Sequence, residues 1–211
     1  MMKILSVNVA QPQTLIAGKL AVQSAIAKCP VEGPVMVRRT NLDGDRQADL
    51  KVHGGVNKAV YAYPSEHYDF WRRDLGKELP YGMFGENLTT EGLVDSEVFI
   101  GDRYQIGSTI LTVTQPRTPC YKLAARLEYQ PILERMYSER RHGWYMSVEQ
   151  EGTIAAGDEI RLIGRPANSI TVLELISVWM GKDLSPELVA RSLALDLSPK
   201  WKNKIVQRTG A

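Results

Sequence analysis

Hydrophobic and polar positions alternate in short runs between residues 35 and 163, and turn residues separate the runs. This pattern is typical of a β-rich sandwich or barrel. The clearest predicted strands are residues 35–37, 59–63, 97–100, 103–106, 109–114 and 160–163. Glycines at 101 and 107 supply the chemistry of tight hairpins, so residues 98–114 are predicted to form a three-stranded meander. Residues 1–9 are predicted to form a first strand.

Helical spacing interrupts the strands twice and then replaces them. Ser65 can cap a helix that places Tyr68, Trp71 and Leu75 on one face, and residues 131–141 carry apolar side chains at helical spacing. After residues 165–168 the pattern changes from strand-like to helical. This change predicts a division into a β-rich domain, 1–167, and a small three-helix C-terminal subdomain, 168–211. The three helix starts are marked by a Thr171-x-x-Glu174 capping box and by Ser185-Pro186 and Ser198-Pro199.

Composition places the chain among ordinary globular proteins. It has 211 residues, of which 44% are hydrophobic and 24% charged, and its net charge is +2. That balance argues against a surface that binds nucleic acid or anionic membranes as a whole, so any basic site must be local. The first residues lack a signal-peptide core, and the densest apolar window, 170–180, contains Glu174 and Ser177. We therefore expect a cytoplasmic protein without a membrane span.

Two cysteines, Cys29 and Cys120, are far apart in the sequence. Their number excludes CxxC pairs and a four-cysteine zinc site, and it favours a reducing compartment, although one long-range disulfide remains open. Cys120 follows a predicted strand on a loop with two prolines, and Arg117 and Lys122 flank it. These cations favour the thiolate, which attacks electrophiles or binds a soft metal. The alternative is that Cys120 is a small buried hydrophobic residue.

Two other segments carry candidate binding residues. His53 precedes a double glycine and Lys58 follows it, an arrangement that suits a phosphate, although taken alone it favours a plain glycine turn with solvated lysines. Asn87 follows Phe84-Gly85-Glu86, and its amide can read the edge of a heterocycle or serve a turn. Lys28 and Arg46 are further cations at expected strand or loop ends.

Taken in order, these segments resemble the MOSC family, named for the C-terminal domain of molybdenum-cofactor sulfurase. The resemblance runs from Ser24 to Ile163, and its elements are Asp45 to His53-Gly54-Gly55, Lys58-Ala59-Val60, His67-Tyr68, Phe84-Gly85-Glu86-Asn87-Leu88, Gly101-Asp102-Arg103, Arg117-Thr118-Pro119-Cys120 and Gly157-Asp158. The helical tail is similar to the extension of a bacterial subgroup, the YiiM-like proteins.

This resemblance implies a twisted β-barrel that holds a molybdenum cofactor of the molybdopterin type. It implies that Cys120 is the protein ligand to molybdenum, which suits a thiolate beside a dithiolene. It also implies that Lys28 and Arg46 bind the cofactor phosphate. Other positions implied to face the cofactor are Arg117, Thr118 and Asn87 at the pterin and dithiolene, and His53 and Lys58 at the mouth.

The activity implied by the resemblance is two-electron reduction of N-hydroxylated compounds, such as hydroxylamino-purines and amidoximes. The cofactor supplies the redox chemistry and the protein orients the small-molecule substrate. No sequence pattern for a flavin or an iron–sulfur site is present, so the electrons are expected from a separate reductase.

Other functions stay open at this point. Cys120 can carry a persulfide as a sulfur carrier for cluster or cofactor assembly. It can also act as a hydrolase nucleophile with His53 or His142. The basic tail around Trp201 can resemble a helix-turn-helix module, but nucleic acid is an unexpected partner at this net charge, and a solvated face or a homodimer contact is favoured. The basic residues of this tail are Lys200, Lys202, Lys204 and Arg208.

Overall fold

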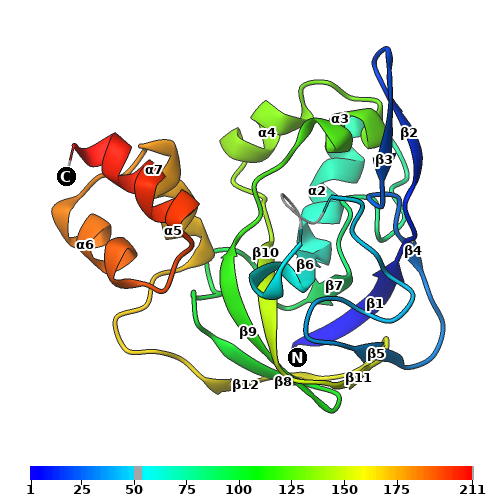
Figure 1. Ribbon diagram of the computed structural model, residues 1–211, viewed down its shortest axis with the longest axis horizontal. Coiled ribbons are helices and arrows are strands. Elements are labelled where there is room, and N and C mark those ends of the chain that lie inside the picture. The colour runs from blue at the N-terminus through cyan, green and yellow to red at the C-terminus, as the bar shows by residue number, and fades with distance from the viewer. Residues whose placement is uncertain (50–53, 211) are drawn as a thin grey trace.

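The computed structural model describes residues 1–49 and 54–210, and its centre is one large mixed sheet (Figure 1). The sheet has eight strands, antiparallel except for the β6–β7 pair. In spatial order they are β12 (Ile160–Gly164), β8 (Arg103–Ile106), β9 (Thr109–Pro116), β10 (Trp144–Gln150), β6 (Val60–Pro64), β7 (Leu88–Glu91), β1 (Lys3–Val9) and β4 (Cys29–Pro30).

The sheet curls towards a barrel but does not close. Its first strand, β12, meets β1 at an isolated bridge between Lys3 and Glu159, and Ile160 donates its N–H to the carbonyl of Met2 at 2.9 Å. Ile4 also exchanges backbone hydrogen bonds with residues 157 and 158, and further along β1 the strand pairs with β4, through Asn8 and Val9. A mainly β fold with added helices is thus confirmed, whereas the expected barrel is an open, strongly curved sheet.

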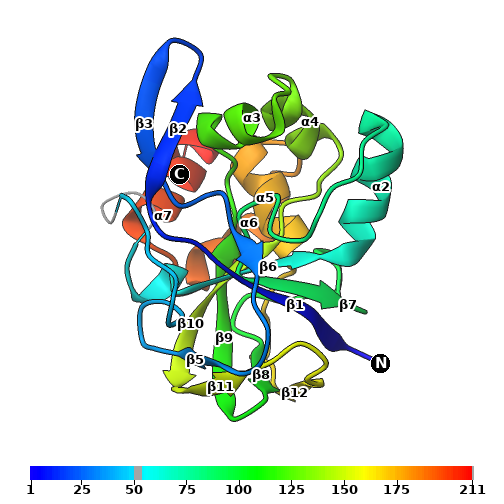
Figure 2. The same ribbon diagram turned by 90° about the vertical axis from the view of Figure 1, so that its right-hand side faces the viewer.

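Two small sheets complete the β structure. A hairpin of β2 (Gln13–Ala17) and β3 (Leu20–Ser24) projects from the body, and β5 (Val35–Val37) pairs with β11 (Gly152–Ile154). Figure 2 shows the β2–β3 hairpin standing beside α3 (Tyr121–Leu127) and α4 (Ile132–Ser138) above the end of the sheet. The hairpin and α3 therefore pack against each other at the same end of the molecule.

Side-chain alternation explains the central strands. In β9, the inward positions from Thr109 to Gln115 are buried and the intervening ones are half-exposed, as expected for a strand with one face on the core.

The predicted strand at 97–100 is wrong. Val98 and Ile100 are buried, but their backbone groups bond to residues 172 and 170, ahead of the C-terminal helices, instead of to a neighbouring strand of the meander.

Helices cover the ends and one side of the sheet. Besides α3 and α4, they are the 3-10 turn η1 (Val56–Lys58), α2 (Ser65–Leu75), α5 (Val172–Met180), α6 (Pro186–Ala194) and α7 (Pro199–Thr209). The helix predicted from Ser65 is present, although Ser65 is its first residue and Pro64 occupies the cap. The α3 helix was not predicted, because its sequence reads as the end of an extended loop.

The three C-terminal helices begin where the capping signals predicted. Thr171 and Glu174 form both bonds of the capping box, at 3.0 and 2.7 Å, whereas Ser185 and Ser198 precede prolines without a side-chain cap bond. Buried residues of these helices share one hydrophobic cluster with the sheet, and the ring centres of Trp179 and Trp201 lie 4.4 Å apart. The division at residue 167 stays a prediction. Within the described residues no helix is long and apolar enough to cross a membrane.

Gly143 offers a test of how tightly β10 begins against β6. Its φ is 66°, and a Cβ there would lie 2.4 Å from the carbonyl oxygen of Ala62. We expect Gly143→Ala to lower the free energy of unfolding by at least about 3 kcal/mol, because backbone strain of about 1–2 kcal/mol adds to a clash that side chains cannot relieve. Urea unfolding followed by circular dichroism measures this loss.

Gly157→Ala is the matched control for this test. Gly157 also has a positive φ, 94°, but a Cβ would meet nothing within 4 Å. Gly157→Ala should lower the free energy of unfolding only by the backbone strain, about 1–2 kcal/mol. Equal losses in both variants would contradict the close approach of Gly143 to β6.

Candidate functional site

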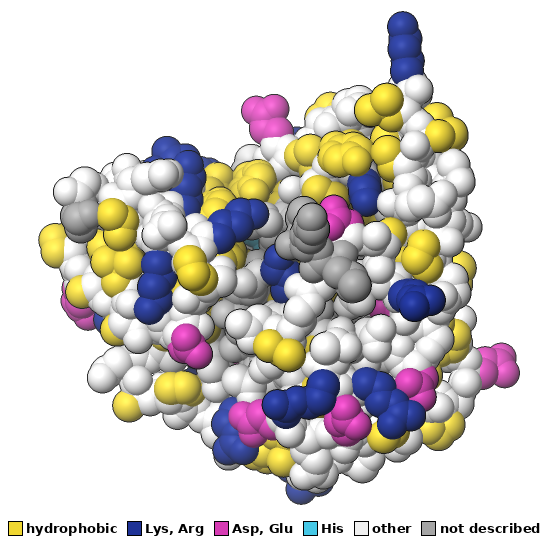
Figure 3. Space-filling model, viewed as in Figure 1, with side chains coloured by type: hydrophobic (Ala, Val, Ile, Leu, Met, Phe, Trp, Pro, Cys, Tyr) yellow, Lys and Arg dark blue, Asp and Glu magenta, His cyan; other side chains and the backbone are white. Residues whose placement is uncertain are grey.

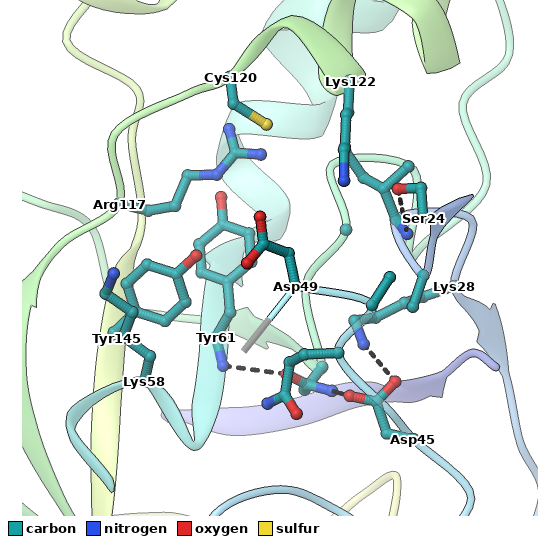
Figure 4. Close-up of a pocket in the computed structure, with 16 residues that line it drawn as sticks. Ser24, Lys28, Asp45, Asp49, Lys58, Tyr61, Arg117, Cys120, Lys122 and Tyr145 are labelled. Atoms are coloured by element: carbon teal, nitrogen blue, oxygen red, sulfur yellow. Dashed lines mark hydrogen bonds and ion pairs between the residues drawn. The ribbon is translucent and has the colours of Figure 1, made fainter. Parts of the chain in front are cut away.

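A pocket opens at the end of the sheet where five separate chain segments meet (Figure 4). It encloses about 630 Å³ of space, including the part open to solvent. Its walls come from the loop after β3, the loop after β5, the β6–β7 region, the end of β9 with α3, and β10. The polar and aromatic lining residues are Ser24, Lys28, Asp45, Gln47, Asp49, Lys58, Tyr61, Asn87, Arg117, Cys120, Lys122 and Tyr145.

Cys120 lies at the start of α3, directly after the loop with Pro116 and Pro119. Its backbone is extended, with φ of −129°, and it occupies the N-cap position of the helix. The thiol is free and partly exposed, and it points towards the guanidinium of Arg117 (Figure 4). The alternative of an inert buried cysteine does not fit this position, because the side chain lines an open pocket.

Arg117 is a buried cation beside that thiol. Its side chain is 5% exposed and lies with its guanidinium 5.3 Å from the centre of the Tyr61 ring and 3.5 Å from the Phe84 carbonyl oxygen. Within ranges 1–49 and 54–210 no carboxylate forms an ion pair with it. Burial opposes the charged form, but Tyr61, Tyr145 and Cys120 outweigh burial and raise the pKa of Arg117. The guanidinium is therefore available to compensate an anion in the pocket.

Lys28 is also buried at the pocket, but its charge is already paired. Its ammonium donates to a carboxylate oxygen of Asp45, which also accepts from the backbone of Ala10 at 2.8 Å. Burial lowers the pKa of Lys28, and the charge of Asp45 opposes that shift. Since the ion pair neutralises Lys28 within the protein, its predicted phosphate contact would compete with Asp45.

Asn87 holds the pocket wall together with its side-chain amide. The amide nitrogen donates to Asp45 at 2.9 Å and to the carbonyl of Asn8 at 3.3 Å, and the amide oxygen accepts from the backbone of Tyr61 at 3.1 Å. Both donors and one acceptor site are used in these contacts. Asn87 therefore ties three segments together, while its predicted contact with a pterin stays a prediction.

Lysines line the mouth of the pocket. Lys58 places its ammonium 5.9 Å from the centre of the Tyr145 ring, and Lys122 donates to the backbone carbonyl of Gln23 at 3.0 Å. Burial and the charge of Lys200 on α7 both lower the pKa of Lys58. Figure 3 shows several Lys and Arg side chains on the C-terminal helices, some of them next to the body of the molecule. Lysines therefore bring positive charge to the mouth, and Asp49 also lines the pocket.

The structure brings together five of the candidates: Lys28, Lys58, Asn87, Arg117 and Cys120. Arg46 is exposed, and neither it nor Thr118 lines the pocket. Arg46 turns outward because its neighbour Asp45 is the residue whose side chain enters the wall. His53 lies outside the described residues.

Sequence reasoning missed the aromatic side of the pocket. Tyr61 on β6 and Tyr145 on β10 are directly opposite in the strand register, and their ring centres lie 5.3 Å apart. The signal that would have found them is the cross-strand pairing of two tyrosines, which needs the strand order in addition to the sequence. Asp45 was missed as a lining residue for a similar reason, because its partners Lys28 and Asn87 are distant in the chain.

A metal bound here would need ligands besides those of the protein. Among the residues that the structure describes, no group of three or more His, Cys, Asp or Glu side chains is placed to hold a metal ion. Cys120 is a single thiol donor, which suits a metal whose other ligands come from a sulfur-rich cofactor.

The match to a family model decides what kind of protein this is: the model described as the MOSC domain matches residues 49–161. The chain belongs to the MOSC domain family. This MOSC protein is 39% identical over 169 residues to the uncharacterized protein YflK of Bacillus subtilis, covering 80% of this chain and 76% of YflK. It is 36% identical over 189 residues to protein YiiM of Escherichia coli, covering 88% of this chain and 84% of YiiM.

Solved structures agree with this membership over the whole chain. The crystal structure of YiiM from Geobacillus stearothermophilus superimposes with a TM-score of 0.82 at 30% identity, covering 99% of this chain and 100% of that protein. The predicted resemblance to YiiM-like MOSC proteins is thus confirmed. A relative named "Reductase" from Gibberella moniliformis is 36% identical over 181 residues, which are 84% of this chain but 32% of that longer protein.

His142 lies behind the pocket and does not line it. Its ring is fully buried, and its Nδ1 lies 3.2 Å from the Arg117 carbonyl oxygen, to which it can only donate. This position on the far side of Arg117 does not fit a hydrolase pair with Cys120. Burial lowers the pKa of His142 to about 4, partly opposed by Asp95.

The depressed pKa of His142 makes stability depend on pH in a defined window. In the unfolded chain the pKa of His142 is the ordinary histidine value of about 6.5, whereas in the folded protein it is about 4. Stability is therefore complete above pH 6.5 and falls as the pH drops from 6.5 towards 4, by about 3 kcal/mol for this group alone. Urea unfolding at half-unit pH steps measures the slope.

His142→Asn is the comparison for this titration, because its amide can still donate to the Arg117 carbonyl but cannot take up a proton. We expect its stability to fall less between pH 6.5 and 4 than that of the unaltered protein. Parallel curves for the two proteins would show that His142 does not titrate as described.

Proposed function

We propose that this MOSC protein is an oxidoreductase that binds a molybdenum cofactor of the molybdopterin type in the pocket and reduces N-hydroxylated small molecules. The observation that carries the proposal is the juxtaposition of the Cys120 thiol with the buried Arg117 guanidinium in one pocket. A thiolate is a protein ligand for a soft metal, and the cation beside it suits an anionic ligand. Family membership supports the same assignment.

The residues of the pocket fit such a cofactor. Arg117 carries a buried charge that no described carboxylate neutralises, and Tyr61 and Tyr145 present flat rings along one wall. Planar rings suit a planar heterocycle, and the positive charge of Lys58 at the mouth suits a phosphate. For the phosphate, Lys58 and Arg117 fit better than the predicted Lys28, which is paired with Asp45, and the predicted Arg46, which does not line the pocket.

The reaction proposed consumes two electrons and two protons: R–NH–OH + 2 e⁻ + 2 H⁺ gives R–NH₂ + H₂O. When bound, the cofactor supplies the two-electron redox chemistry. The chain contributes the Cys120 thiolate that holds the metal, the Arg117 charge that compensates the anionic cofactor, and the tyrosines that shape the wall. Burial raises the pKa of both Tyr61 and Tyr145, so both hydroxyls stay protonated at neutral pH.

A separate reductase is proposed to deliver the electrons. The relative named "Reductase" carries a segment similar to this chain within a protein about three times as long, which supports an arrangement in which other domains or partners work with the MOSC unit. The cytoplasmic location and the homodimer stay predictions.

Metal analysis tests the cofactor assignment. Protein purified from cells that make molybdopterin is expected to contain about one molybdenum and one pterin per chain, because a single Cys120 thiolate completes the site. Cys120→Ser should lose the molybdenum, since a hydroxyl is a poor ligand for a soft metal. Inductively coupled plasma mass spectrometry and pterin fluorescence provide the two measurements.

Cys29→Ser is the matched control, because Cys29 is the other free thiol and is exposed away from the pocket lining. It should keep the metal content of the unaltered protein. Full molybdenum occupancy in the Cys120 variant would remove the ligand assignment. A protein that carries added sulfur on Cys120 but no pterin would favour the sulfur-carrier alternative.

Turnover tests the reaction class. With a reduced viologen dye as electron donor, the metal-loaded protein should convert a hydroxylamino-purine to the amino-purine, and Arg117→Met should lower kcat/KM by about tenfold or more through weaker cofactor binding. Product chromatography follows the conversion. No conversion by fully metal-loaded protein would exclude this substrate class.

A further inference from the structure

A buried polar network lies directly behind the pocket and outside its lining. Its centre is Asp95, which is 3% exposed and sits in the loop before β8. One carboxylate oxygen of Asp95 accepts from the backbone N–H groups of His142 at 3.0 Å and Gly143 at 2.9 Å. The other oxygen lies 2.6 Å from Nε2 of His67 on α2. Burial opposes ionisation, yet these contacts lower the pKa of Asp95.

The proton positions in this network follow from the donors. Arg141 lies 2.9 Å from Nδ1 of His67, and because arginine only donates, that nitrogen must accept. Nε2 of His67 then carries the hydrogen and donates to Asp95. His67 thus connects the Arg141 side chain to the same carboxylate that binds the backbone of the next two residues.

The segment held by Asp95 in turn holds the functional side of the pocket. The carbonyl of Gly143 accepts from the backbone N–H of Arg117 at 3.1 Å, and the ring of His142 donates to the Arg117 carbonyl at 3.2 Å. The carbonyl of His142 accepts from the Tyr61 hydroxyl at 2.9 Å. Both backbone groups of Arg117 and the hydroxyl of a pocket tyrosine therefore bond to two consecutive residues, His142 and Gly143, which have no regular secondary structure.

We infer that Asp95 and His67 are positioning residues that hold the Arg117 guanidinium against the Cys120 thiol. Residues 141–143 lie outside the helices and strands, so hydrogen bonds with the Asp95 carboxylate and the His67 ring fix their conformation instead. Neither residue lines the pocket, and they act through residues 141–143. The inference deepens the proposed function by naming the residues that keep its cation in place.

The charge beside Cys120 is measured by alkylation with two reagents of similar size. Iodoacetate is an anion and iodoacetamide is neutral, so the ratio of their rates at Cys120 reports the nearby positive charge, whereas general loosening of the fold raises both rates together. Protein from a host without molybdopterin keeps the thiol free, and peptide mass mapping separates Cys120 from Cys29. Exposed Cys29 serves as an internal standard in every sample.

We expect Asp95→Asn and His67→Ala to lower the iodoacetate-to-iodoacetamide ratio at Cys120 by at least about threefold, towards the value of Arg117→Met, with no change at Cys29. His67→Gln should restore the ratio, because one amide can donate to Asp95 and accept from Arg141. Asp102→Asn is the matched control. Asp102 is also a fully buried carboxylate, but it pairs with Arg165 away from the pocket, so its loss should destabilise the fold without moving the ratio.

An unchanged ratio in folded His67→Ala and Asp95→Asn proteins would overturn the inference, as would an equal drop in Asp102→Asn. If Asp95→Asn fails to fold, the His67→Ala and His67→Gln pair decides the outcome alone. Because the assay needs no cofactor, its result is independent of the metal analysis. Protein that binds molybdenum normally but shows no change in ratio would contradict this inference and leave the proposed function intact.

Discussion

The buried guanidinium of Arg117 is the interaction on which this site depends. Burying a charge that is 5% exposed costs several kcal/mol of desolvation, and among the described residues no carboxylate forms an ion pair with it, although Asp49 lines the same pocket. What the chain offers instead is partial: the ring of Tyr61, the carbonyl of Phe84 and the thiol of Cys120. In the proposed function, the anionic cofactor would supply the rest of the compensation, so the buried charge of Arg117 supports that proposal.

Lys28, the other buried cation at the pocket, has a carboxylate partner, and Arg117 does not form such an ion pair among the described residues. Lys28 is buried to a similar degree at the same pocket, yet it meets Asp45, and that carboxylate is fixed in turn by Asn87 and by the backbone of Ala10. The ion pair of Lys28 holds the wall together, whereas Arg117, which has no such pair among the described residues, is the cation proposed to bind the ligand. The structure thus distinguishes two buried cations that the sequence alone could not separate.

Sequence patterns predicted the elements whose conformation depends on neighbouring residues in the chain. They failed where a contact with a residue distant in the sequence determines the structure. Alternation in β9 and the capping box at Thr171 are local, so both were found. Residues 97–100 have strand-like side chains, but their backbone groups form hydrogen bonds with residues 170 and 172 at the start of α5 and not with a neighbouring strand. Arg117 and Cys120 were found because they lie three residues apart on one loop. Tyr61 and Tyr145 were missed because only the sheet order brings them together.

The site also extends beyond the part of the chain that matches the MOSC domain, residues 49–161. Lys28 and Asp45 precede that range, and Asn87 within it binds Asp45, so the N-terminal segment completes one wall. On the other flank, the charge of Lys200 lowers the pKa of Lys58 at the mouth, which brings α7 within electrostatic range of an entering ligand. The matched domain supplies the thiol, the buried cation and the lysines at the mouth, while the N-terminal flank completes one wall and the C-terminal flank adds the charge of Lys200.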